Sequence, residues 1–136
     1  MSKQKGDKRE RQARRLLQRG GYLVETPNYQ KYSNIDFFNM FDLMATRSDR
    51  PLRLIQVKSN KAAGIRAYAN QAAAWFDLDH TDVELWICHD RQGWRVLDVR
   101  ERADGAGATY TTILDERDHA CNMGEAVVEW LLPNAG

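Results

Sequence analysis

The chain has 136 residues, of which 43% are hydrophobic and 29% are charged, and these proportions are typical of one ordinary globular domain. We therefore expect a single domain over residues 1–136 with one core. No apolar run is long enough to span a bilayer of roughly 30 Å, and the N-terminus lacks the apolar core of a secretory signal, so we expect a protein that acts in the cytoplasm without a membrane partner.

The net charge of +1 hides an uneven distribution. Eight Lys or Arg residues, against Asp7 and Glu10, lie within the first 20 positions, so the rest of the chain is slightly acidic. A basic end on a near-neutral body suits a polyanionic partner. The alternative is a solvated helix face that binds nothing.

In chain order, the first element expected is a helix over 7–19, because this stretch lacks Gly, Pro and β-branched residues and Gly20-Gly21 follows it. Residues 1–6 precede this helix and could be disordered. Ala13, Leu16 and Leu17 form its apolar stripe, and Glu10 lies on or beside that stripe.

The remaining pattern alternates between strands and helices. Ser48-Asp49-Arg50-Pro51 reads as a turn and 90–93 as a hairpin turn. Residues 102–136 are expected to be a C-terminal extension that contains a Gly/Ala-rich loop and a helix. The expected strands are 22–25, 41–45, 52–58, 83–88 and 94–99, and the later helices are about 67–76 and 124–132. This order predicts an α/β sandwich with a mixed sheet.

Asp42 and the sequence Gln56-Val57-Lys58 carry the strongest chemical signal. Asp42 lies in an apolar strand, where an unpaired carboxylate is costly, and Gln56 and Lys58 project from one side of the next strand. A short turn between the strands can bring the three together. Carboxylate and amide oxygens can hold Mg²⁺, and a fixed ammonium can orient a water or stabilise charge on a phosphate. Glu10 could supply a second carboxylate.

The same residues occur in a familiar order. The sequence resembles the archaeal-type Holliday junction resolvases of the PD-(D/E)xK nuclease superfamily, over about residues 5–100. The matching stretches are Lys5-Gly6-Asp7-Lys8-Arg9-Glu10-Arg11, Asp42-Leu43-Met44-Ala45, Leu54-Ile55-Gln56-Val57-Lys58 and Gly93-Trp94-Arg95. The resemblance implies a restriction-endonuclease-like α/β sandwich with a central mixed five-stranded sheet flanked by helices.

The resemblance also implies a function and a site. By matching position, Glu10, Asp42, Gln56 and Lys58 would be catalytic, and the first three would bind Mg²⁺, with Mn²⁺ as a substitute. The partner would be branched DNA, above all four-way junctions, and the protein would be a homodimer whose two sites cut opposing strands. The residues implied to contact DNA phosphates are Lys5, Lys8, Arg9 and Arg11 of the first helix, and Ser33 of the following loop.

Two departures from the family pattern qualify the site. Gln56 stands where the family has Glu, which removes one negative charge and implies weaker metal affinity. The connection over 27–39 is longer than the family's loop, and its aromatic residues could stack on opened bases instead, namely Tyr29, Tyr32, Phe37 and Phe38.

Other interpretations stay open. Asp42 and Lys58 could be a structural ion pair, Glu10 could pair with Arg14 on the helix surface, and Gln56 could be an ordinary strand residue. The alternative functions are a non-catalytic or partner-dependent DNA-binding module of the same fold, or a restriction-type or transposon-type nuclease that cuts linear duplex.

Overall fold

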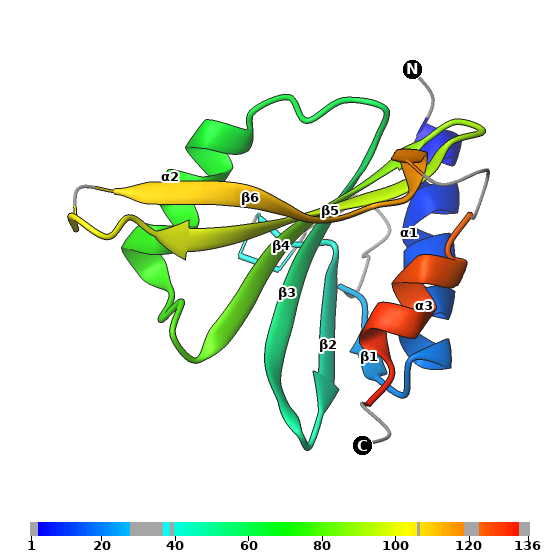
Figure 1. Ribbon diagram of the computed structural model, residues 1–136, viewed down its shortest axis with the longest axis horizontal. Helices are drawn as coiled ribbons and strands as arrows, with labels where there is room; N and C mark the ends of the chain where they lie inside the picture. The colour runs from blue at the N-terminus through cyan, green and yellow to red at the C-terminus, as the bar shows by residue number, and fades with distance from the viewer. Residues whose placement is uncertain (1–2, 28–36, 39, 106, 119–122, 134–136) are drawn as a thin grey trace.

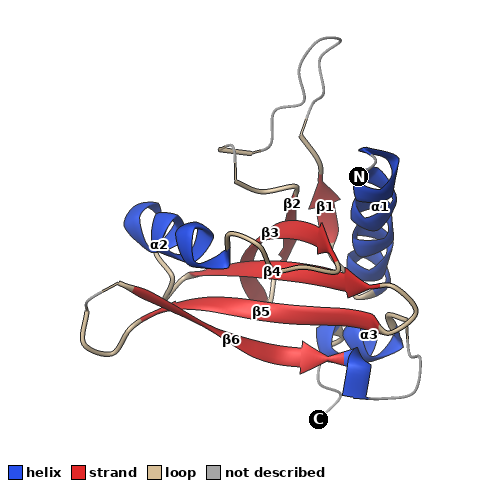
Figure 2. Cartoon of the chain, turned by 90° about the horizontal axis from the view of Figure 1, so that it is seen from above, coloured by secondary structure: helices blue, strands red, loops and turns tan. Residues whose placement is uncertain are grey.

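All strands of the computed structural model, which describes residues 3–27, 37–38, 40–105, 107–118 and 123–133, belong to one sheet. The strands lie side by side in chain order, β1-β2-β3-β4-β5-β6 (Figures 1 and 2). Neighbours pair antiparallel except β3 and β4, which are parallel. The strands are β1 (Leu23–Glu25), β2 (Leu43–Arg47), β3 (Arg50–Ser59), β4 (Thr81–His89), β5 (Gly93–Glu101) and β6 (Ala108–Asp115). The predicted mixed α/β architecture is confirmed.

The parallel pair requires a crossover, and helix α2 (Ile65–Trp75) provides it. Gly64 precedes the helix with φ of 77°, a left-handed conformation that glycine adopts without steric cost. Tyr68, Ala69 and Ala72 of α2 are buried against the sheet. The small alanine side chains let this helix lie close to β5 and β6.

The helices cover the two faces of the sheet in an uneven way (Figure 1). Helix α1 (Lys3–Arg19) and helix α3 (Glu125–Leu131) lie on one face, and α2 lies on the other. Ala13, Leu16 and Leu17 of α1 are buried in the first of two cores, so the predicted apolar stripe of this helix lies against the sheet. Trp86 and Trp94 meet edge to face in that core, with ring centroids 5.9 Å apart.

The end of the chain is part of the domain rather than an appendage. Strand β6 pairs along β5 from Arg95↔Asp115 to Glu101↔Ala108, so the sheet has six strands where five were expected. Val127, Val128 and Leu131 of α3 are buried in the core that α1 also enters. A short 3₁₀ turn, η1 (Glu116–Asp118), leads toward α3. Residues 102–136 therefore contribute both a strand and core side chains.

One further expectation concerns the start of the first helix. Helix α1 begins at Lys3, so it includes part of the segment expected to precede it. Trp75, at the end of α2, is 78% exposed. No helix in the described part of the chain combines the length and the apolar character needed to cross a membrane.

Candidate functional site

Strand β3 presents different residues to the two faces of the sheet. Ile55 and Val57 pack in the core beneath α1 and α3, whereas Leu54 belongs to the core beneath α2. Because side chains alternate along a strand, Gln56 and Lys58 lie on the α2 face with Leu54. Both side chains are half-buried. They are therefore within reach of solvent, as a site for a large substrate requires.

Asp42 lies directly beside this pair, immediately before β2. Its backbone N–H donates to the carbonyl oxygen of Ile55 at 2.8 Å, and its carboxylate Oδ2 accepts a hydrogen bond of 2.7 Å from the backbone N–H of Val57. The paired register of β2 and β3 begins with Leu43 opposite Ile55, so Asp42 lies just before the ladder and is held to β3 by these two bonds. Asp42 therefore lies against the β3 backbone next to Gln56 and Lys58, and the joint action of the three side chains stays a prediction.

The position of Asp42 is fixed from its N-terminal side by Phe41. That side chain is fully buried and meets the rings of Tyr68 and Phe76 edge to face, at centroid distances of 5.9 and 5.3 Å. An anchor of this kind holds the next residue against β3. The half-buried carboxylate of Asp42 is thus presented by a rigid segment of backbone.

Tyr68 of α2 is a neighbour that the sequence did not reveal. Its hydroxyl donates to the carbonyl oxygen of Glu84 at 2.8 Å. Burial raises the pKa of Tyr68 well above the usual value for tyrosine, and the carboxylates of Glu84 and Asp42 add to the rise. The hydroxyl therefore remains a protonated donor beside the candidate site. An isolated tyrosine in an alanine-rich helix gave no pattern that could have identified it.

Glu10 belongs to the other face. It is half-buried on α1, one turn before Ala13, and α1 packs on the Ile55 and Val57 side of β3. To join Asp42, its side chain would have to pass the end of β3. Three of the four predicted catalytic residues are thus close together, and the meeting of Glu10 with them stays a prediction.

Arg9 differs from its expected role as a DNA contact. Its side chain is 10% exposed and forms an ion pair with Asp90, in the turn between β4 and β5. Its Nη1 also donates to Gln12 at 2.8 Å, and Asp90 accepts a 3.1 Å hydrogen bond from Asn60, just past β3. Arg9 therefore joins α1 to two loops and is poorly placed to meet a phosphate.

The other basic candidates have different positions. Lys8 and Arg11 are exposed on α1, as contact with DNA phosphates requires. Lys5 lies in the same helix. Ser33 lies outside the residues that the structure describes.

The donor chemistry of the site can be compared with the needs of Mg²⁺. Among the described residues, no group of three or more His, Cys, Asp and Glu side chains could hold a metal ion. The replacement of a carboxylate by Gln56 agrees with this finding, because it leaves one carboxylate and one amide at the β2–β3 junction. Both are hard oxygen donors of the type that Mg²⁺ prefers, so the donor set fits this ion but carries little charge.

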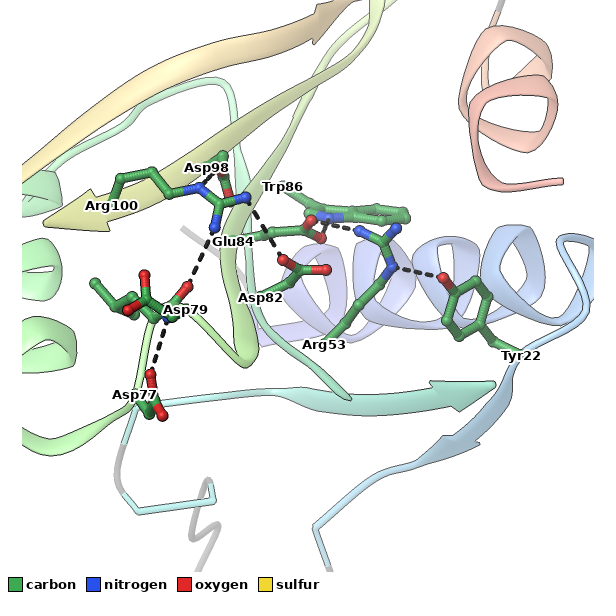
Figure 3. Close-up of polar contacts among 10 residues, drawn as sticks. Tyr22, Arg53, Asp77, Asp79, Asp82, Glu84, Trp86, Asp98 and Arg100 are labelled. Atoms are coloured by element: carbon green, nitrogen blue, oxygen red, sulfur yellow. Dashed lines mark hydrogen bonds and ion pairs between the residues drawn. The ribbon is translucent and has the colours of Figure 1, made fainter. Parts of the chain in front are cut away.

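A second polar cluster lies near the other end of β3, with Arg53 and Glu84 at its buried centre (Figure 3). Arg53 and Glu84 are 2% and 1% exposed and form an ion pair with an N–O distance of 2.5 Å. Arg53 also donates to the Tyr22 hydroxyl at 2.9 Å, and the Trp86 indole donates to Glu84 at 3.0 Å. The Arg53 guanidinium lies 4.7 Å from the ring centre of Trp130. These contacts give each charged group several partners.

These contacts nevertheless do not keep the pKa of Glu84 at its ordinary value. Burial raises the pKa of Glu84 to about 7, although the Arg53 guanidinium acts to lower it, and the carboxylates of Asp82 and Asp98 add to the rise. Arg100 forms ion pairs with both of these aspartates, at 3.7 and 2.5 Å. Because Arg53 and Glu84 are sealed from solvent, this cluster stabilises the fold and cannot meet a substrate.

The fold itself is similar to that of a solved structure of the Holliday junction resolvase Hjc from the archaeal hyperthermophile Archaeoglobus fulgidus. The match covers 80% of this chain and 84% of that protein, with a TM-score of 0.52 and 16% sequence identity. The sequence matches no protein-family model and no curated protein. The resolvase-type fold that the sequence motifs predicted is therefore confirmed.

Proposed function

We propose that this protein is a metal-dependent endodeoxyribonuclease that hydrolyses phosphodiesters in branched DNA, with the four-way junction as its preferred substrate. The observation that carries the proposal is the hydrogen bond between the Asp42 carboxylate and the Val57 backbone. It supports the proposal because Val57 lies between the half-buried residues Gln56 and Lys58 in the sequence of β3, on a fold similar to that of an archaeal resolvase.

The residues have distinct roles in this proposal. Asp42 and Gln56 would hold Mg²⁺ through their oxygens, with Mn²⁺ as a substitute, and Glu10 would complete the set if its side chain reaches the end of β3. When bound, the ion would supply positive charge to the scissile phosphate. The hydrogen bond from Val57 restricts the Asp42 carboxylate to one orientation, so little ordering is needed when the ion binds.

Lys58 would act on the substrate directly. It lies two residues beyond Gln56 on the same side of β3, so its ammonium can approach the phosphate that Asp42 and Gln56 face. From there it would orient or deprotonate the attacking water, or stabilise the charge that grows on the phosphate oxygens. Lys5, Lys8 and Arg11 of α1 would contact neighbouring phosphates, and a two-fold dimer would present two sites to opposing strands.

Cleavage of labelled DNA tests the proposal. Four-way junctions and linear duplexes are incubated with the protein in Mg²⁺, in Mn²⁺ and in EDTA. Asp42→Asn and Lys58→Ala should each lower the cleavage rate at least about 100-fold, because each removes a charge that acts on the phosphate, while junction affinity stays within a few-fold of wild type. Asp49→Asn is the matched control, since Asp49 is an exposed carboxylate in the β2–β3 turn, and it should cut normally. Full activity in either site variant would overturn the assignment.

Gln56 favours a second candidate function, a DNA-binding module that does not cut. The missing carboxylate lowers the charge available to a metal ion, in agreement with the lack of a three-member acidic or histidine group among the described residues. This function predicts salt-sensitive junction binding without cleavage in Mg²⁺ or Mn²⁺. Cleavage gained by Gln56→Glu would support it, whereas cleavage by the wild type would exclude it. Cleavage of the linear duplex in the same assay would instead indicate a restriction-type or transposon-type nuclease.

A further inference from the structure

A hollow between α2 and β6 is lined by hydrogen-bond donors and small side chains. Its volume is about 510 Å³. None of the described residues that line it is a carboxylate, although the chain has 19 acidic residues. The lining residues are Arg66, Ala69, Asn70, Arg102, Ala108, Thr109 and Tyr110. Two guanidinium groups together with amide and hydroxyl donors suit an anion that carries several oxygens.

The fold brings these groups together from three elements. Arg66, Ala69 and Asn70 are spaced by three and four residues, so they share one face of α2. Ala108, Thr109 and Tyr110 come from β6, which pairs with the end of β5. Arg102 follows β5, and its backbone N–H donates to the carbonyl oxygen of Gly107 at 2.9 Å, which closes the loop between the two strands. The hollow is therefore formed by the folded backbone.

The local charge favours an anion. Arg66 lies in the first turn of α2, where the helix dipole is positive and no acidic residue is present. Arg102 forms an ion pair with Asp104 at 3.1 Å, but both side chains are more than half exposed. Exposed pairs of this kind are weak and are readily exchanged for another partner. Arg102 can therefore turn to a phosphate while Asp104 returns to solvent.

The hollow lies on the same face of the sheet as the candidate site. One row of paired residues crosses the sheet from β6 to β3 and consists of Tyr110, Val99, Val83 and Leu54. Leu54 is two residues before Gln56 on β3. Three strand spacings of about 4.8 Å separate β6 from β3, so the two places are roughly 15 Å apart. Along the axis of a DNA duplex, the phosphates of one strand follow one another every 3.4 Å or so. A duplex bound at the candidate site with its axis along this direction can therefore reach the hollow with a phosphate about four nucleotides away.

We propose that the α2–β6 hollow is a phosphate-binding site in which Arg66 and Arg102 hold the backbone of the nucleic acid. This inference rests on the proposed function for the identity of the ligand, but the phosphate chemistry follows from the lining residues themselves. The site would position the DNA without reading its sequence, because phosphates are the same at every step. A free phosphate compound shares this chemistry and is separated from DNA by the test.

The experiment measures binding rather than cleavage, in EDTA, so that it does not depend on nuclease activity. Wild type, Arg66→Gln, Arg102→Gln and the double variant are titrated onto labelled four-way junctions and single strands at several salt concentrations. Arg50→Gln is the matched control, because Arg50 is exposed at the start of β3 and its replacement removes the same charge. The loss of two phosphate contacts should reduce the slope of log affinity against log salt by about 2, and lower the affinity roughly tenfold at low salt. Arg50→Gln should retain the wild-type slope.

Inorganic pyrophosphate provides the second arm, read from the backbone amide resonances of Asn70 and Thr109. If the double variant loses DNA affinity, the site holds a nucleic acid backbone. If DNA binding is unchanged but pyrophosphate shifts these resonances in the wild type alone, the site stands and its ligand is a free phosphate compound. The proposal is overturned if neither DNA nor pyrophosphate binding depends on the two arginines. Cleavage that persists in that case would leave the nuclease function intact and reject only the hollow.

Discussion

Glu84 should make the stability of this protein fall as the pH rises from 5 to 8. Its carboxyl is 1% exposed, and burial raises its pKa to about 7 from an ordinary value of 4.5. Between these two values the folded protein holds a proton that the unfolded chain releases. The stabilising contribution of the protonated group is therefore complete below pH 4.5 and is lost as the pH rises through 7. The informative perturbation is Glu84→Gln, which resembles the protonated side chain at every pH.

The size of the effect follows from the shift in pKa. A difference of about 2.5 pKa units corresponds to about 3 kcal/mol of unfolding free energy, most of which is lost between pH 5 and 8. For a domain of this size, urea lowers the unfolding free energy by about 1–3 kcal/mol per molar. The contribution of Glu84 should therefore move the urea midpoint of the wild type down by roughly 1–3 M across this range. Glu84→Gln should lack this part of the shift.

The assay is urea denaturation followed by tryptophan fluorescence at pH 5, 6, 7 and 8. His89, whose pKa is lowered by burial, contributes a change of opposite sign, but it is present in both proteins and cancels in the comparison. Glu125→Gln is the control, because a hydrogen bond from Arg19 lowers the pKa of this exposed carboxyl and it titrates below the tested range. If the urea midpoints of wild type and Glu84→Gln change with pH in the same way, the attraction to Arg53 outweighs the effect of burial on the pKa of Glu84. That result would refute the reasoning.

Three smaller predictions concern contacts that hold the helices in place. Arg9→Ala should lower the unfolding free energy by about 1–2 kcal/mol in urea, since it removes the ion pair with Asp90, and an unchanged midpoint would mean that the pair is solvated. Gly20→Ala should lower the melting temperature, with a cost of about 1–3 kcal/mol, because the added Cβ would lie 2.6 Å from the Cβ of Leu131. Tyr68→Phe should cost about 1 kcal/mol by thermal denaturation through the loss of its 2.8 Å hydrogen bond, and no loss would show that this bond contributes nothing to stability.

Most of the fold could be predicted from local patterns. Alternation along 52–58 predicted β3, and the Asp90–Gly93 turn predicted the β4–β5 hairpin, which the structure forms. Strand β6 was missed although Tyr110, Thr111, Thr112 and Ile113 have high strand propensity. The preceding Gly/Ala-rich segment suggested a loop, and the pairing with β5 that makes this segment a strand is a long-range contact. An edge strand with one partner leaves a weaker sequence pattern than a central one.

Part of the candidate site could also be predicted from local patterns. Asp42 and the β3 pair are joined by a short hairpin, so their closeness follows from the register of neighbouring strands. Arg9 shows the limit of this reasoning. A basic residue in a basic helix looks solvated, and only the folded chain brings Asp90 to it from a turn 81 residues away. The pair of Arg53 with Glu84 was likewise hidden, because an arginine within a strand is usually at the surface.

The two polar clusters of β3 show why a perturbed pKa is not a guide to function in this protein. Strong perturbation often marks an active site, and Glu84 carries a large shift. Its carboxylate, however, is enclosed by Arg53, Trp86 and the core, so no phosphate can approach it. Asp42 is half-buried and accepts a hydrogen bond from the β3 backbone just before Lys58, whose side chain lies on the face of the sheet opposite Glu84. A DNA backbone must reach the groups that act on it, so the proposal that Asp42 and Lys58 are catalytic rests on their access to solvent and not on the size of a pKa shift.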